Sequence, residues 1–283
     1  MAITLIIPTL NASGCLKSLL PRIGQQDTMP VEIIIIDSAS EDNTVEVARS
    51  FGAKTIVVPR RTFNHGRTRN LAAQEARGDV IAFMTQDALP FDNTLLRVLT
   101  SPLARPEIAG SFGRQIAKPD APLPEVFARA FNYPDVPSIK GIRDTEKYGI
   151  KTFFFSNVCS AIKKDLFFKV GMFPENIHAN EDMILAAKLM LNGYMVSYVP
   201  EARVIHSHSF SPLSQFRRYY YIASSLRRNS WILEFARPEA EGIRFMKEEA
   251  SFLLRHRGYR WMLHVVLDSF VKYAGYRMGL LTG

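Results

Sequence analysis

The 283-residue sequence contains only two cysteines, Cys15 and Cys159, and their separation matches no metal-ligand spacing. A secreted disulfide scaffold is therefore not indicated, and both thiols are expected to be reduced, as in a cytosolic protein. Long apolar runs are also missing. The polar residues His264 and Asp268 interrupt the last apolar stretch well before the roughly 20 residues of a membrane span. No basic segment precedes the short apolar run of residues 1–8, which predicts a first strand and no signal peptide.

A glycine-rich loop is absent after that first strand. Dinucleotide-binding and S-adenosylmethionine-binding folds carry a G-x-G-x-x-G loop at this point, and here only Gly14 is present. A nucleotidyltransferase on a related fold would carry a glycine-rich loop with Arg and Lys. The segment Thr9-Leu10-Asn11-Ala12 does not supply one. These three classes are therefore disfavoured.

Positive charge is plentiful and unevenly spread. The formal net charge is +8, and residues 216–283 hold twelve Lys and Arg against six acidic residues, an excess of six. Such a tail suits nucleic acid, anionic lipid or an anionic substrate equally well.

Apolar, β-branched runs alternate with helical patterns through the first hundred residues. This alternation is typical of a mostly parallel sheet with helices on both faces, an α/β class fold. The expected strands are residues 3–9, 32–37, 55–59 and 80–85, and the expected helices begin near residues 13, 42, 66 and 93.

The pattern loosens after Pro106, where five prolines predict a loop-rich excursion. Regular structure is expected again at 152–162, in a helix over 180–192 stopped by Gly193, and in strands at 195–199 and 203–206. Beyond Pro212 the chain is predicted to be helical, and its last helix is amphipathic. We expect three regions: 1–105, 106–211 and a basic helical region at 212–283.

Polar residues follow three of the predicted strands at the edge where ligands bind in open α/β sheets. Thr9 and Asn11 follow the first strand, Asp37 and Ser38 the second, and Gln86 and Asp87 the fourth. An unpartnered buried carboxylate costs several kcal/mol, so Asp87 is expected in a cleft or on a cation, unless it caps a loop.

Two further groups could carry chemistry. The arginine-rich segment 59–70 follows a strand and begins a helix, a combination that attracts phosphate. Glu181 and Asp182 begin a helix, where acids are favoured by the dipole, or one of them is a general base. His206 and His208, two residues apart on a strand, could share a cation, although single histidines are more often structural.

Five segments in this order resemble an inverting glycosyltransferase of family 2 with the GT-A fold. Each is weak alone, but together they span about the first 210 residues. They are Pro8-Thr9-Leu10-Asn11, Asp37-Ser38-Ala39-Ser40, Arg69-Asn70, Thr85-Gln86-Asp87-Ala88 and Asn180-Glu181-Asp182. Residues 63–66, Phe-Asn-His-Gly, with the fourth segment look most like the bacterial rhamnosyltransferase-like branch, whose donors are typically dTDP-rhamnose.

The resemblance implies a site. The residues expected at the nucleotide sugar are Thr9, Asn11, Asp37, Ser38, Arg69, Gln86 and Asp87. Asp182 would be the general base, with Glu181 beside it. A divalent cation, Mg²⁺ or Mn²⁺, would be bound by Asp87 with His206 and His208. The family usually shows Asp-x-Asp at this point, whereas Gln86 and Ala88 leave Asp87 as one carboxylate.

The implied function is transfer of a sugar, rhamnose in the first instance, to a glycan or lipid-linked glycan in cell-surface polysaccharide synthesis. Residues 1–105 would bind the donor and 106–211 the acceptor. The basic helical region would contact the inner face of the cell membrane, pack on the catalytic domain or form a homodimer, and no nucleic acid partner is expected. The alternatives are a UDP-hexose-dependent family 2 enzyme and a non-catalytic nucleotide- or glycan-binding module.

Overall fold

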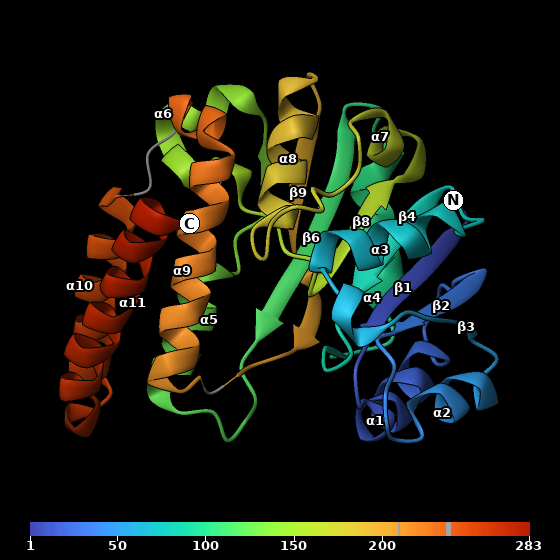
Figure 1. The fold of residues 1–283 in the computed structure, drawn as a ribbon, viewed down its shortest axis with the longest axis horizontal. Helices are drawn as coiled ribbons and strands as arrows, with labels where there is room; N and C mark the ends of the chain where they lie inside the picture. Colours follow the sequence, from blue (N-terminus) through green and yellow to red (C-terminus); the bar gives the residue numbers. More distant parts are fainter. Residues whose placement is uncertain (209, 236–238) are drawn as a thin grey trace.

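One mixed sheet runs through the part of the chain that the computed structural model describes, residues 1–208, 210–235 and 239–283 (Figure 1). Its order is β3-β2-β1-β4-β8-β6-β9-β5, and β7 pairs with β9 outside this path. The strands are β1 Ile3–Thr9, β2 Glu32–Asp37, β3 Lys54–Val57, β4 Val80–Met84, β5 Leu89–Pro90, β6 Ile108–Ile116, β7 Ser138–Lys140, β8 Cys159–Lys163 and β9 Met195–Ile205.

Helices cover both faces of this sheet and form a further layer at the C-terminal end (Figure 1). The α-helices are α1 Ser13–Ile23, α2 Thr44–Ser50, α3 His65–Gln74, α4 Leu95–Thr100, α5 Leu123–Asn132, α6 Thr145–Tyr148, α7 Lys164–Lys169, α8 Glu181–Leu191, α9 Pro212–Arg228, α10 Glu239–Arg255 and α11 Met262–Thr282. Short 3₁₀ segments join them at Arg60–Thr62, Ser101–Ala104, Ile142–Asp144, Gly149–Phe153, Ser230–Glu234 and Tyr259–Trp261.

The first hundred residues form the parallel half of the sheet, as predicted. β1 lies parallel to both β2 and β4, and β2 lies parallel to β3. All five residues of β4 are buried, because helices cover this half on both faces. The expected strand and helix boundaries shift by only a few residues; for example, α2 begins at Thr44 and not at residue 42.

The second half of the sheet is mixed. β8 lies antiparallel to β4 and to β6, and β9 lies parallel to β6. The two strands expected at 195–199 and 203–206 are one continuous strand, β9, whose register with β6 shifts between Gly113 and Arg114.

The prediction of a loop-rich excursion after Pro106 was wrong. This region holds the nine-residue strand β6 and the helix α5, whose prolines occupy the N-cap and the first turn, where no backbone donor is lost. The strand expected from residue 152 begins only at Cys159, because Thr152 and Phe153 form the end of a 3₁₀ segment.

The C-terminal region packs on the sheet domain. Leu226 of α9 and Ile232 join the same buried cluster as the sheet, and Asn180 Nδ2 donates to the carbonyl of Ile222 at 3.3 Å. On α10, the Phe245 ring lies 5.1 Å from that of Phe127 on α5. The helical layer is therefore fixed to the sheet through α9 and α5.

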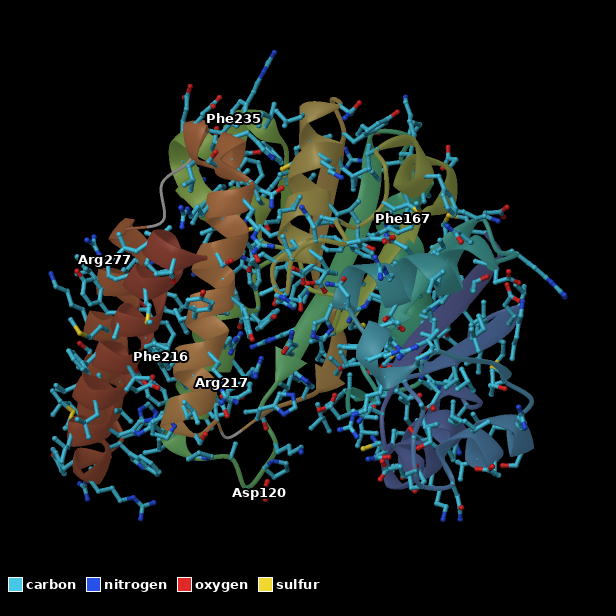
Figure 2. All side chains as sticks on the ribbon, viewed as in Figure 1. Asp120, Phe167, Phe216, Arg217, Phe235 and Arg277 are labelled. Atoms are coloured by element: carbon cyan, nitrogen blue, oxygen red, sulfur yellow. The ribbon has the colours of Figure 1, made fainter. Side chains whose placement is uncertain are left out.

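α11 lies along α9 at a distance that only glycine permits. A Cβ added to Gly275 would meet the carbonyl oxygen of Phe216, labelled in Figure 2, at 2.4 Å. A Cβ on Gly279 would meet the carbonyl oxygen of Tyr220 at 2.2 Å. Two glycines one turn apart therefore let the two backbones touch.

The amphipathic helix predicted near the C-terminus is present as α11, but its apolar side faces outward. Lys272 and Asp268 form a largely buried ion pair of 2.5 Å. The exposed side chains are mostly apolar, with more than half of each accessible: Leu263, Val266, Leu267, Phe270 and Tyr273. Among the described residues, no helix combines the length and the apolar character needed to span a membrane.

Gly279→Ala is expected to destabilise the protein by about 1–3 kcal/mol, because the added methyl group must push α11 away from α9. Gly242→Ala, in α10 with nothing within 4 Å of its added Cβ, is the matched control and should stabilise by up to about 1 kcal/mol. Urea unfolding of the two variants measures the difference. Equal stabilities would contradict the close α9–α11 contact.

Candidate active site

A cavity of about 570 Å³ opens beyond the carboxyl ends of β1 and β4. Ligands bind at this edge in open α/β sheets. Asn11, Asp37, Glu181 and Asp182, also predicted as site residues, do not line it. The predicted residues that line it together are Thr9, Ser38, Arg69, Gln86, Asp87, His206 and His208.

Asp37 is completely buried behind Thr9. Its carboxylate accepts hydrogen bonds from the Thr9 hydroxyl at 2.9 Å, from the Ser40 backbone N–H at 2.7 Å and from the Ser40 hydroxyl at 2.5 Å. The bond from Thr9 ties the ends of β1 and β2 together, and the two from Ser40 hold the turn that follows β2. The buried Ser38 hydroxyl in the cavity wall has no partner among the described residues, so it is available to a ligand.

Asn11 and Gln86 hold the loops around the cavity. The Asn11 side-chain oxygen accepts a hydrogen bond from the backbone N–H of Glu41 at 2.9 Å. The backbone of Asn11 adopts a left-handed φ of 47°. Gln86 Oε1 accepts from the backbone N–H of Leu10 at 2.9 Å, and its Nε2 donates to the carbonyl of the same residue at 3.3 Å. Gln86 thus joins the ends of β4 and β1, while Asn11 faces the neighbouring loop.

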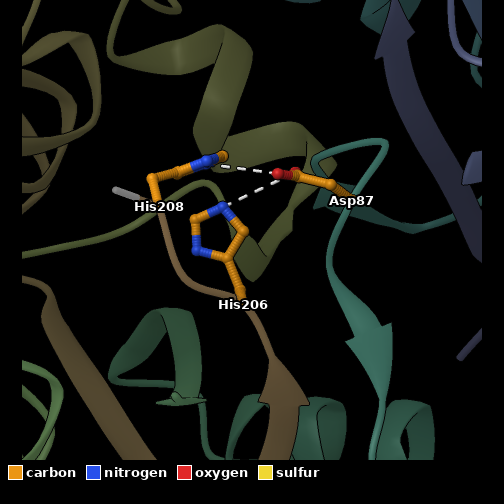
Figure 3. A group of neighbouring side chains, drawn as sticks. All are labelled: Asp87, His206 and His208. Carbon is orange, nitrogen blue, oxygen red and sulfur yellow. Dashed lines mark ion pairs between the residues drawn. The ribbon is translucent and has the colours of Figure 1, made fainter. Parts of the chain in front are cut away.

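Asp87, His206 and His208 form one cluster in the wall of this cavity (Figure 3). His206 Nε2 lies 3.5 Å from Asp87 Oδ1, and His208 Nε2 lies 3.2 Å from Asp87 Oδ2. One ligand atom from each residue falls within 4.8 Å of the others. Two imidazole nitrogens and a carboxylate oxygen are a donor set that suits Mn²⁺, Zn²⁺ or a similar divalent ion.

Gln115 of β6 fixes the orientation of His206. Arg129, which can only donate, bonds to Gln115 Oε1 at 2.5 Å, so Oε1 faces Arg129 and His206 while Nε2 donates to the hydroxyls of Tyr133 and Ser156, at 2.5 and 2.9 Å. Because Oε1 can only accept, Nδ1 of the buried His206 is protonated and donates to Oε1 at 2.9 Å. In the neutral ring, Nε2 then presents a lone pair to the Asp87 carboxylate, an arrangement that requires a proton or a cation between them.

The electrostatics of the cluster favour a charged Asp87. Burial opposes ionisation, but the hydrogen bond and charge of His206, with the charge of His208, outweigh it and hold the pKa of Asp87 well below its usual range. For His208, burial and the neighbouring His206 lower the pKa of the ring, although Asp87 opposes this. The cluster therefore presents an anionic oxygen beside two imidazole rings, a set of side chains that fits a divalent cation.

Arg69 and Glu181 form a buried ion pair at the base of the cavity. Arg69 is 4% exposed, and its guanidinium donates to Glu181 Oε1 at 2.9 Å and to the His65 carbonyl at 3.2 Å. Its Nε is buried with no partner among the described residues. Glu181 is thus committed to a charge partner in the interior of the protein.

Asp182 has a different environment from its neighbour. Its carboxylate accepts from the backbone N–H groups of Met183 at 2.8 Å and Asn157 at 3.3 Å. Burial and the charge of Glu181 raise the pKa of Asp182 to about 7, although both hydrogen bonds and Arg69 oppose the shift. Asn157 precedes Val158, which lines the cavity, so Asp182 stands directly behind its wall.

Several cavity residues were not predicted as site residues. Arg60, Phe63 and His65 also line the cavity. The arginine-rich segment signals them in the sequence, yet it cannot show that Arg67 instead pairs with Glu175 at 3.2 Å. Nothing in the sequence singles out Gln115, because it lies in the region predicted as loops.

A comparison with protein-family models identifies the family of this chain. Residues 4–171, more than half of the chain, match the model described as "Glycosyl transferase family 2". The chain belongs to glycosyl transferase family 2. The family resemblance predicted from five short segments is therefore confirmed, and the protein is a glycosyltransferase.

Two curated relatives of this glycosyltransferase align with nearly its whole length. It is 40% identical over 282 residues to the O-antigen chain rhamnosyltransferase RfbN of Salmonella typhimurium, covering 99% of this chain and 90% of RfbN. It is 37% identical over 279 residues to the O-antigen chain rhamnosyltransferase WbaN of Salmonella anatum, covering 98% of this chain and 88% of WbaN.

Solved structures establish the GT-A fold. The mannosyltransferase PcManGT from Pyrobaculum calidifontis, in complex with GDP-Man and Mn²⁺, superposes with a TM-score of 0.62 at 19% identity, covering 95% of this chain and 86% of that one. TarS 1-349 of S. aureus, in complex with UDP-GlcNAc, gives 0.61 at 15% identity, covering 100% and 91%. At these identities the likeness concerns the fold.

Proposed function

We propose that this family 2 glycosyltransferase transfers rhamnose from dTDP-rhamnose to a glycan or lipid-linked glycan during cell-surface polysaccharide synthesis. The observation that carries the reaction is the cluster of Asp87, His206 and His208 in a cavity that also holds two arginines. The choice of sugar is supported by the full-length similarity to two O-antigen chain rhamnosyltransferases.

The donor would lie along the parallel half of the sheet, in residues 1–105. The Thr9–Asp37 pair and the unpartnered Ser38 hydroxyl are suited to the base and ribose. The guanidinium groups of Arg60 and Arg69 line the same cavity and suit the diphosphate. Asn11 and Gln86 would act by holding the surrounding loops.

A divalent cation fits beside the diphosphate. Asp87 would hold Mg²⁺ or Mn²⁺ with His206 and His208, and such an ion supplies positive charge that stabilises a leaving diphosphate. With one carboxylate in the site, the donor phosphates would complete the coordination.

Asp182 is the proposed general base in a single displacement. It would take the proton from an acceptor hydroxyl, whose oxygen then attacks the anomeric carbon from the face opposite the nucleotide. The carbon–oxygen bond to the diphosphate breaks, and the diphosphate leaves with the electron pair, inverting the configuration. A carboxyl group with a pKa of about 7 suits this task at neutral pH better than Glu181, which is held by Arg69.

A panel of nucleotide sugars tests the proposed donor directly. With Mn²⁺ or Mg²⁺ present, dTDP-rhamnose should stabilise the protein by about 2.7 kcal/mol at a hundredfold excess over its Kd. It should also transfer label to lipid-linked glycan from membranes. A larger shift with a UDP-hexose would favour the UDP-hexose-dependent alternative, and binding without turnover would favour a non-catalytic module.

Asp182→Asn should lower kcat by about 10²–10⁴-fold while leaving the thermal shift by dTDP-rhamnose unchanged. In the wild type, kcat/KM should fall as pH drops below about 7, because a protonated Asp182 cannot accept a proton. Glu181→Gln is the contrasting variant. It should destabilise the fold by about 3–5 kcal/mol, because Arg69 is left buried without its partner. Full activity of Asp182→Asn would contradict the assignment.

We further propose that α11 rests on the inner face of the cell membrane, where a lipid-linked acceptor would lie. Its apolar residues Leu263, Leu267 and Phe270 are exposed, and the exposed Arg260 and Arg277 lie near its two ends. An exposed apolar helix face with flanking cationic side chains suits an anionic lipid surface, to which each Lys or Arg contributes about 1 kcal/mol.

Co-sedimentation with anionic liposomes tests this contact. Binding should be present at low salt, weaken as salt rises and fall strongly in Phe270→Ser. Leu71→Ser, at an exposed leucine of α3, is the control and should bind like the wild type. A homodimer in sedimentation that Phe270→Ser dissociates, with no liposome binding, would show that this face meets a second copy of the chain.

A further inference from the structure

A second cavity, of about 260 Å³, lies among the C-terminal helices and adjoins the first. α5, α9, α10 and α11 all contribute to its wall, and His208 lines both cavities. The backbone N–H of His208 donates to Glu125 Oε1 of α5 at 3.3 Å, and Glu125 also lines the second cavity. One short segment of chain thus separates the cluster at Asp87 from this space.

The lining of the second cavity carries more acidic than basic side chains. Glu125, Glu249 and Asp268 line it, and Lys272, which also lines it, is already paired with Asp268 at 2.5 Å. Glu249 is 3% exposed. Burial raises the pKa of this carboxyl to about 7, with Lys272 opposing the shift. Glu125 is likewise paired with Arg129 at 2.7 Å, so the described lining offers no unpaired lysine or arginine to a phosphate, and the diphosphate of a donor or of a lipid-linked acceptor is not expected here.

Aromatic rings form the rest of the wall. Phe245 and Trp261 line the cavity, and the Lys272 ammonium lies 4.9 Å from the centre of the Phe245 ring. The indole of Trp261 meets the His264 ring edge to face at 5.6 Å. A purely apolar occupant would leave the buried Glu249 carboxyl group unsatisfied, so the ligand must offer both apolar faces and hydroxyl groups.

Two polar atoms in this wall lack partners. Trp261 Nε1, a donor, and Gln215 Oε1, an acceptor, are buried and have no hydrogen-bond partner among the described residues. Each unsatisfied buried group costs about 1–3 kcal/mol. The donor and the acceptor would both be satisfied by a hydroxyl-bearing ligand, because a hydroxyl group donates one hydrogen bond and accepts others.

We propose that this second cavity binds one uncharged sugar residue of the acceptor glycan, next to the residue that receives the transferred sugar. The inference rests on the proposed glycosyltransferase function. It assigns part of acceptor binding to α10 and α11, in addition to the region 106–211 expected from the sequence. The volume is below the roughly 300–1,000 Å³ of pockets for drug-sized ligands, which limits the occupant to about one ring. Carboxyl groups and aromatic faces are the side chains that hold sugar hydroxyls and C–H faces.

Saturation-transfer NMR with methyl glycosides of rhamnose, galactose, mannose, glucose and N-acetylglucosamine tests the site without the natural acceptor. At least one glycoside should show transfer in the wild type, and its Kd should rise by roughly tenfold in Glu249→Gln and in Trp261→Phe. Glu248→Gln is the matched control. The Glu248 carboxylate, next to Glu249 in the sequence, is half exposed and pairs with Arg244 on the outer side of α10.

Donor binding by the same variants is the second measurement. The thermal shift by dTDP-rhamnose with Mn²⁺ should be the same in all four proteins, and the glycoside should bind equally with and without dTDP. If dTDP-rhamnose fails to bind while a glycoside still depends on Glu249, the proposed donor is wrong and the sugar site stands.

Three outcomes would overturn the sugar site. They are no transfer to any glycoside in the panel, equal binding in Glu249→Gln and Glu248→Gln, and competition between the glycoside and dTDP-rhamnose. The last would place the sugar in the first cavity. Because Trp261→Phe removes the indole donor but keeps a smaller aromatic ring in its place, it provides a second test if Glu249→Gln does not fold.

Discussion

The hydrogen bond between Gln115 and His206 is the interaction on which the rest of the site depends. Arg129 donates to Oε1 of Gln115 and fixes the orientation of its amide, and Oε1 in turn accepts from Nδ1 of His206, so that Nε2 faces Asp87. A lone Asp at a strand end binds a divalent ion weakly, and in the proposed metal site a histidine oriented by buried neighbours would compensate. In this way β6 and β9 of the mixed half complete a centre that begins on the parallel half.

The adjacent acids Glu181 and Asp182 have different roles because they differ in burial and in their charge partners. Glu181 pairs with Arg69 in the interior, and burial together with the charge of Glu181 raises the pKa of Asp182 next to it. The same helix start thus contains one structural carboxylate and one group suited to accept a proton at neutral pH. A similar separation of roles is found in the C-terminal helices. Asp268 and Lys272 form an ion pair that faces inward, so the apolar side of α11 is exposed. Glu249 lies in the wall of the second cavity.

The sequence predicted the parallel half and most of the cavity because these depend on local patterns. Strands with apolar runs end at Thr9 and Asp37 and three residues before Asp87, and parallel strands bring their carboxyl ends to one edge. It did not predict β6, because prolines at the start of α5 suggested loops, nor Gln115, whose role depends on partners up to 91 residues away. The direction of the α11 faces was equally hidden, because it is set by the two glycines that contact α9.

The most direct test of the central claim is pulsed electron paramagnetic resonance of Mn²⁺ bound together with dTDP. The account predicts nitrogen couplings from histidine, loss of these couplings when His206 and His208 are replaced by alanine, and about 10–100-fold weaker Mn²⁺ binding in Gln115→Leu. Removing the ion with a chelator should abolish transfer. A bound Mn²⁺ without nitrogen couplings, with an affinity unchanged by Asp87→Asn and Gln115→Leu, would contradict it.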